Sequence, residues 1–304
     1  MKLEGSLVAL VTPMNEDGSI DKQALHDLVE WHIASKTKGL IIAGTTGESA
    51  TLEPDEQFEL VSLVVKQVAK RIPVIAGTGT NSTRTTLTLT ENAKRAGADA
   101  CLIVTPYYNR PTQNGLYQHY KTIAEKSGIP IILYNVPGRT GCDILPETVE
   151  RLSAVAQIIG IKEATGKIER ADEIRQRCRD NFLIYSGDDA TALDLMLKGA
   201  NGVISVTANV APLKMQQMCE AALGGNKREA EKINAELMML HKHLFVESNP
   251  IPTKWALHTM GKIKEGIRLP LLPLDSKYHQ EVKEAMQNAG IEKESVTCET
   301  SSHN

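Results

Sequence analysis

The stretch GLIIAGTTGESATLEPDEQFELVSLVVKQV, residues 39–68, shows the pattern on which the fold prediction rests. It opens with a short apolar run rich in β-branched residues, which is typical of a strand covered on both faces. A glycine-containing turn follows, and Pro54 then stands where the first turn of a helix accepts proline. Four valines recur at helical spacing on one face: Val61, Val64, Val65 and Val68. The stretch is therefore predicted to form one strand, one loop and one helix.

Seven other runs of the same kind are spaced along the chain, which makes eight. The runs are SLVALVTP (6–13), GLIIAGTTG (39–47), PVIAGTGT (73–80), ACLIVTPYY (100–108), PIILYNVPG (130–138), IIGIKEATG (158–166), FLIYSGDD (182–189) and GVISVTAN (202–209). Eight strand–helix units predict an α/β fold, a (β/α)8 TIM barrel. The alternative, a doubly wound sheet, would show a glycine-rich fingerprint after its first strand. The nearest match, GTGTNS at 77–82, has two glycines and belongs to the third run.

The pattern changes after GGN at 224–226, where the strand-like runs stop. A long amphipathic helix is predicted next, and two more segments have helical spacing. The first is marked by Ile233, Leu237, Leu240 and Leu244, and the others are NPIPTKWALHTMG (249–261) and DSKYHQEVKEAMQNAG (275–290). We therefore predict a catalytic barrel over 1–224, a C-terminal helical domain over 225–292 and a disordered polar tail over 293–304.

Composition excludes several classes of function. The 304 residues carry a formal net charge of −3, and 41% of them are hydrophobic. Such a chain buries a sizeable core but has no strongly basic face for nucleic acid. No apolar run reaches the roughly 18 residues of a membrane span, and the start MKLEGSLVALVTP is a poor signal peptide. The five cysteines are scattered without a CxxC motif, so we expect reduced thiols in a cytoplasmic protein.

Lys162 is the residue that most strongly suggests chemistry. It ends the apolar run IIGIK, so it is expected at the carboxyl end of a barrel strand, where active sites of this fold lie. Burial destabilises an ammonium and lowers its pKa from about 10.4. The neutral amine is then a nucleophile that forms a Schiff base with a ketone. The structural alternative is a lysine that reaches solvent or pairs with Glu163 or with an acid on a helix.

Other strand ends offer groups that can assist such a lysine. Tyr134 ends the neighbouring run, and its phenol can move protons during imine formation. The GTTGE turn presents the hydroxyls of Thr45 and Thr46 near a helix N-terminus, which suits a carboxylate. Arg139 follows in a loop and can hold a carboxylate through two hydrogen bonds. The structural alternatives are a packed tyrosine, a helix-capping turn and a solvated arginine.

A metal site is the competing interpretation of Asp188 and Asp189, but their context GDDATAL is typical of a helix N-terminus. No histidine stands at a strand end. Seven fall on helical segments and one in the tail: His26, His32, His119, His241, His243, His258, His279 and His303. A metal-dependent aldolase needs such ligands. The sequence therefore predicts lysine chemistry without a metal ion.

Several motifs together closely resemble the dihydrodipicolinate synthase (4-hydroxy-tetrahydrodipicolinate synthase) family of pyruvate-dependent class I aldolases. They are GTTGES (44–49), TPYYNRPTQNGLYQHY (105–120), YNVPGRTG (134–141), GIKEATG (160–166), SGDD (186–189) and GVISVTANV (202–210). The resemblance runs from GSLVALVTP at 5–13 to RLPLLPL at 268–274. The lysine motif marks only the wider aldolase group, whereas the double tyrosine with Arg139 is much more specific.

The resemblance implies roles for eight residues. The catalytic set, in which the lysine forms an imine with pyruvate and the others relay protons, is Lys162, Thr45, Tyr134 and Tyr108. The substrate-binding set is Thr46 for the carboxylate of pyruvate, Arg139 for that of aspartate semialdehyde, and Gly187 and Ile204 as walls of the pyruvate pocket. In the family, the second tyrosine of YY reaches the site of a neighbouring subunit. A homotetramer, built as a dimer of dimers, is implied.

The implied reaction condenses pyruvate with L-aspartate 4-semialdehyde to 4-hydroxy-tetrahydrodipicolinate, in the diaminopimelate route to lysine. The imine is the electron sink, so no cofactor is expected. Two alternatives use the same lysine: N-acetylneuraminate lyase and a 2-keto-3-deoxy sugar-acid aldolase. Arg139 and the YYNRP loop favour a small carboxylated aldehyde over their polyhydroxylated chains. A third alternative is a non-catalytic barrel that senses a keto acid.

Many members of the family bind the end product lysine at the interface of the tight dimer. This chain retains four matching positions of that pocket: Ser49, Ala50, Asn81 and Tyr107. It departs at three others, because Pro54, Gln57 and Thr85 stand where lysine-sensitive bacterial members carry two histidines and a glutamate. Loss of the carboxylate partner predicts weak or absent inhibition by lysine at millimolar levels.

Overall fold

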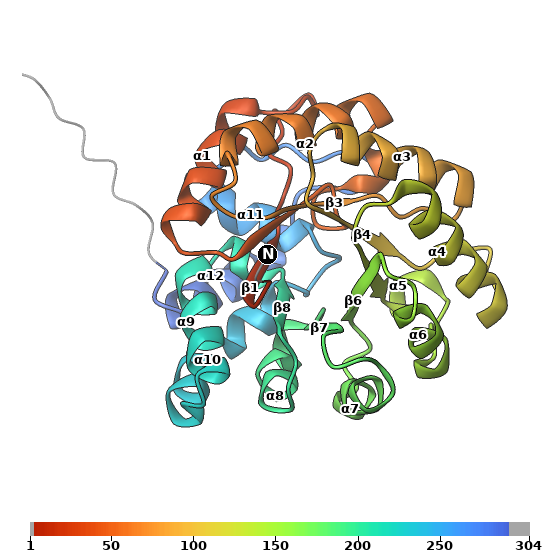
Figure 1. Cartoon of the computed structure of the whole chain (residues 1–304). Helices are drawn as coiled ribbons and strands as arrows, with labels where there is room; N and C mark the ends of the chain where they lie inside the picture. The colour runs from red at the N-terminus through yellow and green to blue at the C-terminus, as the bar shows by residue number, and fades with distance from the viewer. Residues whose placement is uncertain (1–2, 292–304) are drawn as a thin grey trace, which may run out of the picture.

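Eight parallel strands close into a barrel in the computed structural model, which describes residues 3–291 (Figure 1). The strands are β1 (Gly5–Ala9), β2 (Gly39–Ile42), β3 (Val74–Gly77), β4 (Ala100–Val104), β5 (Ile131–Asn135), β6 (Ile158–Glu163), β7 (Leu183–Ser186) and β8 (Gly202–Ser205). Each strand pairs with the next along the chain, and β8 pairs with β1 to close the ring. The predicted (β/α)8 barrel is confirmed, and each strand lies within one of the eight predicted runs except β1, which begins one residue earlier, at Gly5.

Helices surround the barrel, as the alternation of runs predicts (Figure 1). The outer helices are α1 (Lys22–Ala34), α2 (Pro54–Val68), α3 (Thr83–Arg95), α4 (Gln113–Ser127), α6 (Pro146–Ser153), α7 (Ile168–Arg177), α8 (Ala192–Leu197) and α9 (Pro212–Leu223). A short helix, α5 (Pro137–Thr140), lies in the loop after β5, and 3-10 turns occupy Ser49–Thr51, Asp189–Thr191, Thr207–Asn209 and Ser276–Tyr278. In α2, proline opens the helix and the stripe Val61, Val64 and Val68 is buried, as its sequence predicts.

The predicted C-terminal helices are α10 (Lys227–His243), α11 (Ile251–Thr259) and α12 (His279–Asn288). Helix α10 packs against α9 and α12, so the appendage continues the packing of the barrel. The predicted domain boundary at 224 falls in the turn between α9 and α10. The tail predicted over 293–304 lies outside the described residues. No helix within residues 3–291 is long and apolar enough to cross a membrane.

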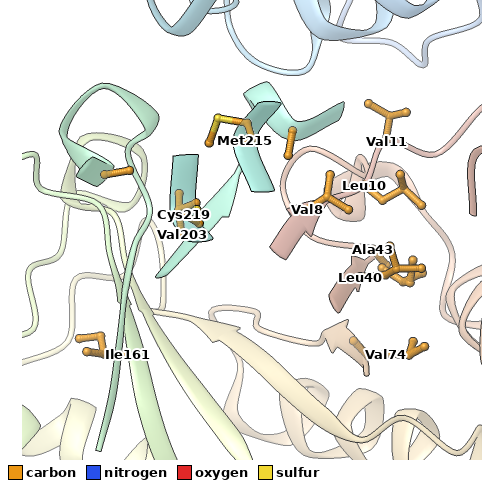
Figure 2. Packing of buried hydrophobic residues seen from close by; sticks show 14 of the residues in the cluster. Val8, Leu10, Val11, Leu40, Ala43, Val74, Ile161, Val203, Met215 and Cys219 are labelled. Atoms are coloured by element: carbon orange, nitrogen blue, oxygen red, sulfur yellow. The ribbon is translucent and has the colours of Figure 1, made fainter. Parts of the chain in front are cut away.

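The core has two layers because side chains alternate across each strand. Figure 2 shows part of the outer layer, which includes Val8, Ile161, Val203 and Met215. The inner layer fills the barrel and consists of Leu3, Leu7, Ala9, Ile41, Ile75, Ala100, Leu102, Ile132, Tyr134, Tyr185 and Ile204. In β6 this alternation turns Ile161 toward the helices and the next residue, Lys162, toward the barrel axis.

Candidate active site

A cavity of about 350 Å³ lies at the carboxyl ends of the strands. It is lined by six of the eight residues to which sequence analysis gives a catalytic or substrate-binding role: Thr45, Thr46, Tyr134, Arg139, Lys162 and Gly187. Barrels of this type place their active sites at this face. The cavity is therefore the candidate active site.

Lys162 stands in β6 beside Tyr134 of β5 and Tyr185 of β7. The lysine is 4% exposed, and its Nζ lies 4.2 Å from the centroid of the Tyr134 ring. Within residues 3–291 no carboxylate forms an ion pair with this Nζ. The face of an aromatic ring attracts a cation but does not replace its hydration shell. The amine thus lies in the wall of the cavity beside the face of an aromatic ring, with no ion-pair partner among the described residues.

Glu163, the nearest acid in sequence, does not pair with Lys162. Its side chain is buried on the other face of β6, where Oε2 accepts from Asn135 Nδ2 at 3.2 Å and Oε1 accepts from the Thr165 backbone N–H at 2.9 Å. Burial raises the pKa of this carboxyl, and the hydrogen bonds from Thr165 and Asn135 oppose the rise. The structural alternative of a Lys162–Glu163 pair is therefore wrong.

Gly187, after β7, leaves space for the lysine side chain. A Cβ at this position would lie 2.6 Å from Ala164 Cβ and 2.9 Å from Lys162 Cε, closer than such atoms can approach. Its backbone N–H donates to the carbonyl of Glu163 at 2.7 Å, so the loop cannot retreat without breaking that bond. Glycine is therefore required here to let the lysine lie along the cavity wall.

The turn after β2 carries the two threonines. Thr45 lines the cavity, and the buried Thr46 accepts a hydrogen bond at Oγ1 from Asn249 Nδ2 at 2.9 Å. Glu48 closes the turn with a φ of 59°, in the left-handed region that is strained for most residues. Its buried carboxylate pairs with Lys254 of α11 and accepts from the Arg268 N–H at 3.1 Å. The C-terminal helices thus hold this turn from outside the barrel.

Arg139 approaches from α5 at the mouth of the cavity. Its Nη2 donates to the carbonyl oxygen of Asn249 at 3.0 Å. One nitrogen of the guanidinium is thus fixed, which leaves the other N–H groups available to a ligand carboxylate. The position fits the predicted role of Arg139 as a carboxylate-binding residue.

Two predicted site residues do not line the cavity. Ile204 belongs to the inner layer of the barrel core, and Val206, two residues further on, lines the cavity in its place. Tyr108 is 90% exposed, with a φ of 73°, and points into solvent in the single chain. Its predicted role in the site of a neighbouring subunit therefore stays a prediction.

A second cavity, of about 400 Å³, adjoins the first and shares Thr45 and Arg139 with it. Ser49, Ala50 and Tyr107 of the predicted lysine pocket line it, as do the three departing positions Pro54, Gln57 and Thr85. Asn81 is not among its lining residues; its carbonyl accepts from Asn109 Nδ2 at 2.8 Å. The residues that line this cavity include no acid.

Glu53 and Glu56, two acids adjacent in sequence to lining residues of the second cavity, are exposed or paired elsewhere. Glu56 forms two hydrogen bonds with the Arg268 guanidinium, at 2.6 and 2.7 Å, and also accepts from the Glu53 backbone N–H. This pairing lowers the pKa of Glu56 to about 2. Glu53 is exposed. Neither carboxylate supplies a partner for an ammonium in the second cavity.

The described acids and histidines do not form a metal site. Asp189 lies in the first turn of a short helix, as its context predicts, and its Oδ2 accepts from the Val206 and Thr207 N–H groups at 2.9 Å. The seven described histidines fall on helices. No group of three or more potential ligands comes together within residues 3–291.

Sequence analysis misses the residues that the C-terminal segment brings to the site. Phe245 and Asn249 line the cavity although they follow no barrel strand. Lys254 reaches the turn after β2 from helix α11. An Asn-Pro pair ahead of a helix indicates only a helix start, so no local signal marks Asn249 as part of a site.

Comparisons with known proteins agree on one family. The sequence profile of the Dihydrodipicolinate synthetase family matches residues 2–289. The chain is 60% identical over 289 residues to the 4-hydroxy-tetrahydrodipicolinate synthase of Methylococcus capsulatus, covering 95% of this chain and 99% of that protein. The enzyme of the same name from Pseudomonas aeruginosa is 59% identical, with the same coverage.

Solved structures that match the chain belong to the same family. The chloride-inhibited dihydrodipicolinate synthase from Acinetobacter baumannii, complexed with pyruvate, matches with a TM-score of 0.94 and 51% identity, over 95% of this chain and 100% of that chain. The enzyme from Cyanidioschyzon merolae with lysine bound matches with a TM-score of 0.93 and 38% identity, over 95% of this chain and 99% of that one.

Proposed function

The chain belongs to the dihydrodipicolinate synthetase family, and from this premise we propose how its cavity performs the reaction of that family. The chain is a lyase that condenses pyruvate with L-aspartate 4-semialdehyde to 4-hydroxy-tetrahydrodipicolinate, in the diaminopimelate route to lysine. The observation that carries the mechanism is Lys162, a buried amine without a carboxylate partner in the cavity.

The reaction begins when Lys162 Nζ attacks the ketone carbon of pyruvate. Loss of water from the carbinolamine gives an imine, and removal of a methyl proton gives an enamine. Tyr134 supports this step, because its ring lies against Nζ, and with Thr45 it moves the protons that these conversions require. The imine draws the electrons of the breaking C–H bond, so the step uses no cofactor.

The enamine carbon then attacks the aldehyde of L-aspartate 4-semialdehyde and forms the new C–C bond. The amino group of the second substrate next attacks the imine carbon, closes the ring and expels Lys162 as a free amine. Thr46 binds the carboxylate of pyruvate deep in the cavity. Arg139, at the mouth, binds the carboxylate of the second substrate.

Tyr108 completes the site from a second copy of the chain. Its ring is almost fully exposed in one protomer and its backbone is held in a left-handed conformation, an arrangement that suits a side chain presented to a neighbour. The assembly is a homotetramer that contains this tight dimer. The cysteines Cys101, Cys142, Cys178 and Cys219 are buried and unpaired, which fits a reducing cytoplasmic location.

Trapping of the imine tests the mechanism. The protein is incubated with pyruvate and borohydride and digested, and the mass adduct is located. We expect the adduct on Lys162 alone and nearly complete loss of turnover in a folded Lys162→Ala variant. An adduct on another lysine, or none, contradicts the mechanism. Assays with N-acetylneuraminate and with a 2-keto-3-deoxy sugar acid, neither of which should be cleaved, distinguish the related aldolases.

A further inference from the structure

Asn249 lies between the two groups that bind substrate carboxylates. It precedes α11, is buried and lines the active-site cavity. Its side chain contacts Thr46, and its backbone carbonyl contacts Arg139. One residue from the C-terminal helices therefore touches both carboxylate-binding groups, although it is 203 positions from the threonine.

The hydrogen bonds around Asn249 form a chain from Thr253 to Thr46. The hydroxyl of Thr253, one turn along α11, donates to Asn249 Oδ1 at 3.2 Å. The carboxamide oxygen faces this hydroxyl, and Nδ2 donates to Thr46 Oγ1 at 2.9 Å. A carboxamide nitrogen only donates, and Thr46 Oγ1 is therefore the acceptor in this bond.

The direction of this bond determines what Thr46 offers to a substrate. A threonine hydroxyl has one hydrogen and two lone pairs. Because one lone pair is occupied by Asn249, the hydrogen is free to point at an acceptor in the cavity. A carboxylate accepts and cannot donate, so this polarity is the one that binds it. The reverse polarity would aim a lone pair at the carboxylate and repel it.

An ion pair connects the segment that contains Asn249 to the rest of the site. The Lys254–Glu48 ion pair joins α11 to the turn that carries Thr46, and both side chains are almost completely buried. This pair ties the segment that carries Asn249 to the turn that carries Thr46, so the packing of α11 against that turn holds the amide beside the hydroxyl.

We propose that Asn249 is a positioning residue, oriented by Thr253, which turns the hydroxyl hydrogen of Thr46 toward the carboxylate of pyruvate. The inference rests on the proposed function, in which Thr46 binds that carboxylate. It predicts that Asn249 affects the affinity for pyruvate and that it does so only through Thr46.

The test is Asn249→Asp, which keeps the shape and reverses the bond. A carboxylate only accepts, so Thr46 must donate to it and face the substrate with a lone pair. We expect the pyruvate concentration for half-maximal borohydride labelling of Lys162 to rise about 10- to 100-fold, the range for loss of a hydrogen bond to a charged group. Labelling at saturation should stay within about twofold, because the lysine is untouched. Asn288→Asp, on the exposed surface of α12, controls for the change in net charge and should leave labelling unchanged. Asn249→Ala, which adds no charge to the cavity, separates loss of the hydrogen bond from repulsion of the substrate by the new carboxylate.

A double-mutant cycle with Thr46→Val separates this role from a structural one. The cycle uses Asn249→Ala, which adds no charge beside the substrate. This change should raise the half-maximal concentration about three- to tenfold in the wild-type background and less than about twofold in the Thr46→Val background, where the hydroxyl that Asn249 orients is absent. A full effect in the Thr46→Val background, or no effect in the wild-type background, overturns the proposal.

The proposed function and this inference fail in different ways. If wild-type protein gives no adduct on Lys162, the proposed function is wrong. If wild-type protein is labelled and Asn249→Asp saturates at the same pyruvate concentration, the function stands and the inference is wrong. Thr253→Val, which removes only the hydroxyl that orients the amide, should raise the half-maximal concentration in the same direction by a smaller factor.

Discussion

Lys254→Met should destabilise the protein far more than loss of an ordinary surface lysine. The side chains of Lys254 and Glu48 are 3% and 2% exposed, and burial lowers the pKa of the lysine while Glu48 opposes that shift. Without the cation, the Glu48 carboxylate keeps one protein donor, the Arg268 N–H. Removal of one partner from a buried pair typically costs about 3–5 kcal/mol, because the other charge stays buried and uncompensated. We expect a loss of this size in the free energy of unfolding.

Equilibrium unfolding in urea measures this loss, and two variants make the result interpretable. Lys22→Met breaks the Lys22–Glu59 pair, whose side chains are 55% and 48% exposed, and should cost about 1 kcal/mol or less. Adding Glu48→Gln to Lys254→Met removes the stranded charge and should recover at least about half of the loss. If Lys254→Met costs no more than Lys22→Met, the ion pair does not fix α11 to the turn after β2.

Further predictions concern the space that Gly187 leaves for Lys162, stability in acid, the site shared between subunits and inhibition by lysine. Gly187→Ala should slow borohydride labelling at least about tenfold while the protein stays folded, because the added Cβ displaces Lys162. Gly138→Ala is the control and should not slow labelling, because a Cβ at that position meets nothing within 4 Å. Burial and the charge of Lys262 lower the pKa of His32 to about 3. As the pH falls below 6.5, His32 therefore becomes protonated in the unfolded chain while it stays neutral in the folded chain. The contribution of His32 to the free energy of unfolding should therefore fall by up to about 1.4 kcal/mol per pH unit between pH 6.5 and 4, so the total pH dependence should be smaller in His32→Gln, as urea titrations can measure. Tyr108→Phe should slow turnover, and mixing it with Lys162→Ala should restore activity through hybrid sites; inactive hybrids confirmed by mass would exclude a shared site. Lysine titrated at saturating pyruvate should inhibit weakly or not at all, and half-inhibition well below 1 mM would contradict this.

The fold was predictable because its signals are local. Each strand is a short apolar run, and the helices between them show their buried stripes in the spacing of valines and leucines. Lys162 was predictable for the same reason, since the strand that contains it also determines which way it points. Its lack of a pairing with Glu163 follows from the same alternation, which sends adjacent side chains to opposite faces of β6.

The rest of the site depends on contacts that no local pattern records. Asn249 and Phe245 enter the cavity because α10 packs on α9 and returns the chain over the barrel mouth. Ile204 and Val206 are both apolar residues near the end of the β8 run. Which of them lines the cavity depends on how far the cavity extends along the strand, and the sequence does not show that. Tyr108 is exposed in the single chain and becomes buried only if a second chain covers it, so the sequence of one chain cannot show which residues it contacts.

The candidate active site adjoins the cavity of the predicted lysine pocket, and the two cavities differ in which of their lining residues can change independently. Thr45, Ser49 and Arg139 line both cavities, so a substitution at any of them would alter the reaction as well as a ligand next to it. Pro54 and Thr85, where this chain departs from the lysine-sensitive pattern, line the second of these two cavities and not the first. The same holds for Gln57, whose amide donates to the carbonyl of Gly77 at the end of β3. Substitutions at these three positions can change the charge of the second cavity without replacing a residue that lines the first. A chain with this arrangement of lining residues can therefore lose lysine binding in the second cavity and keep the residues that carry synthase activity.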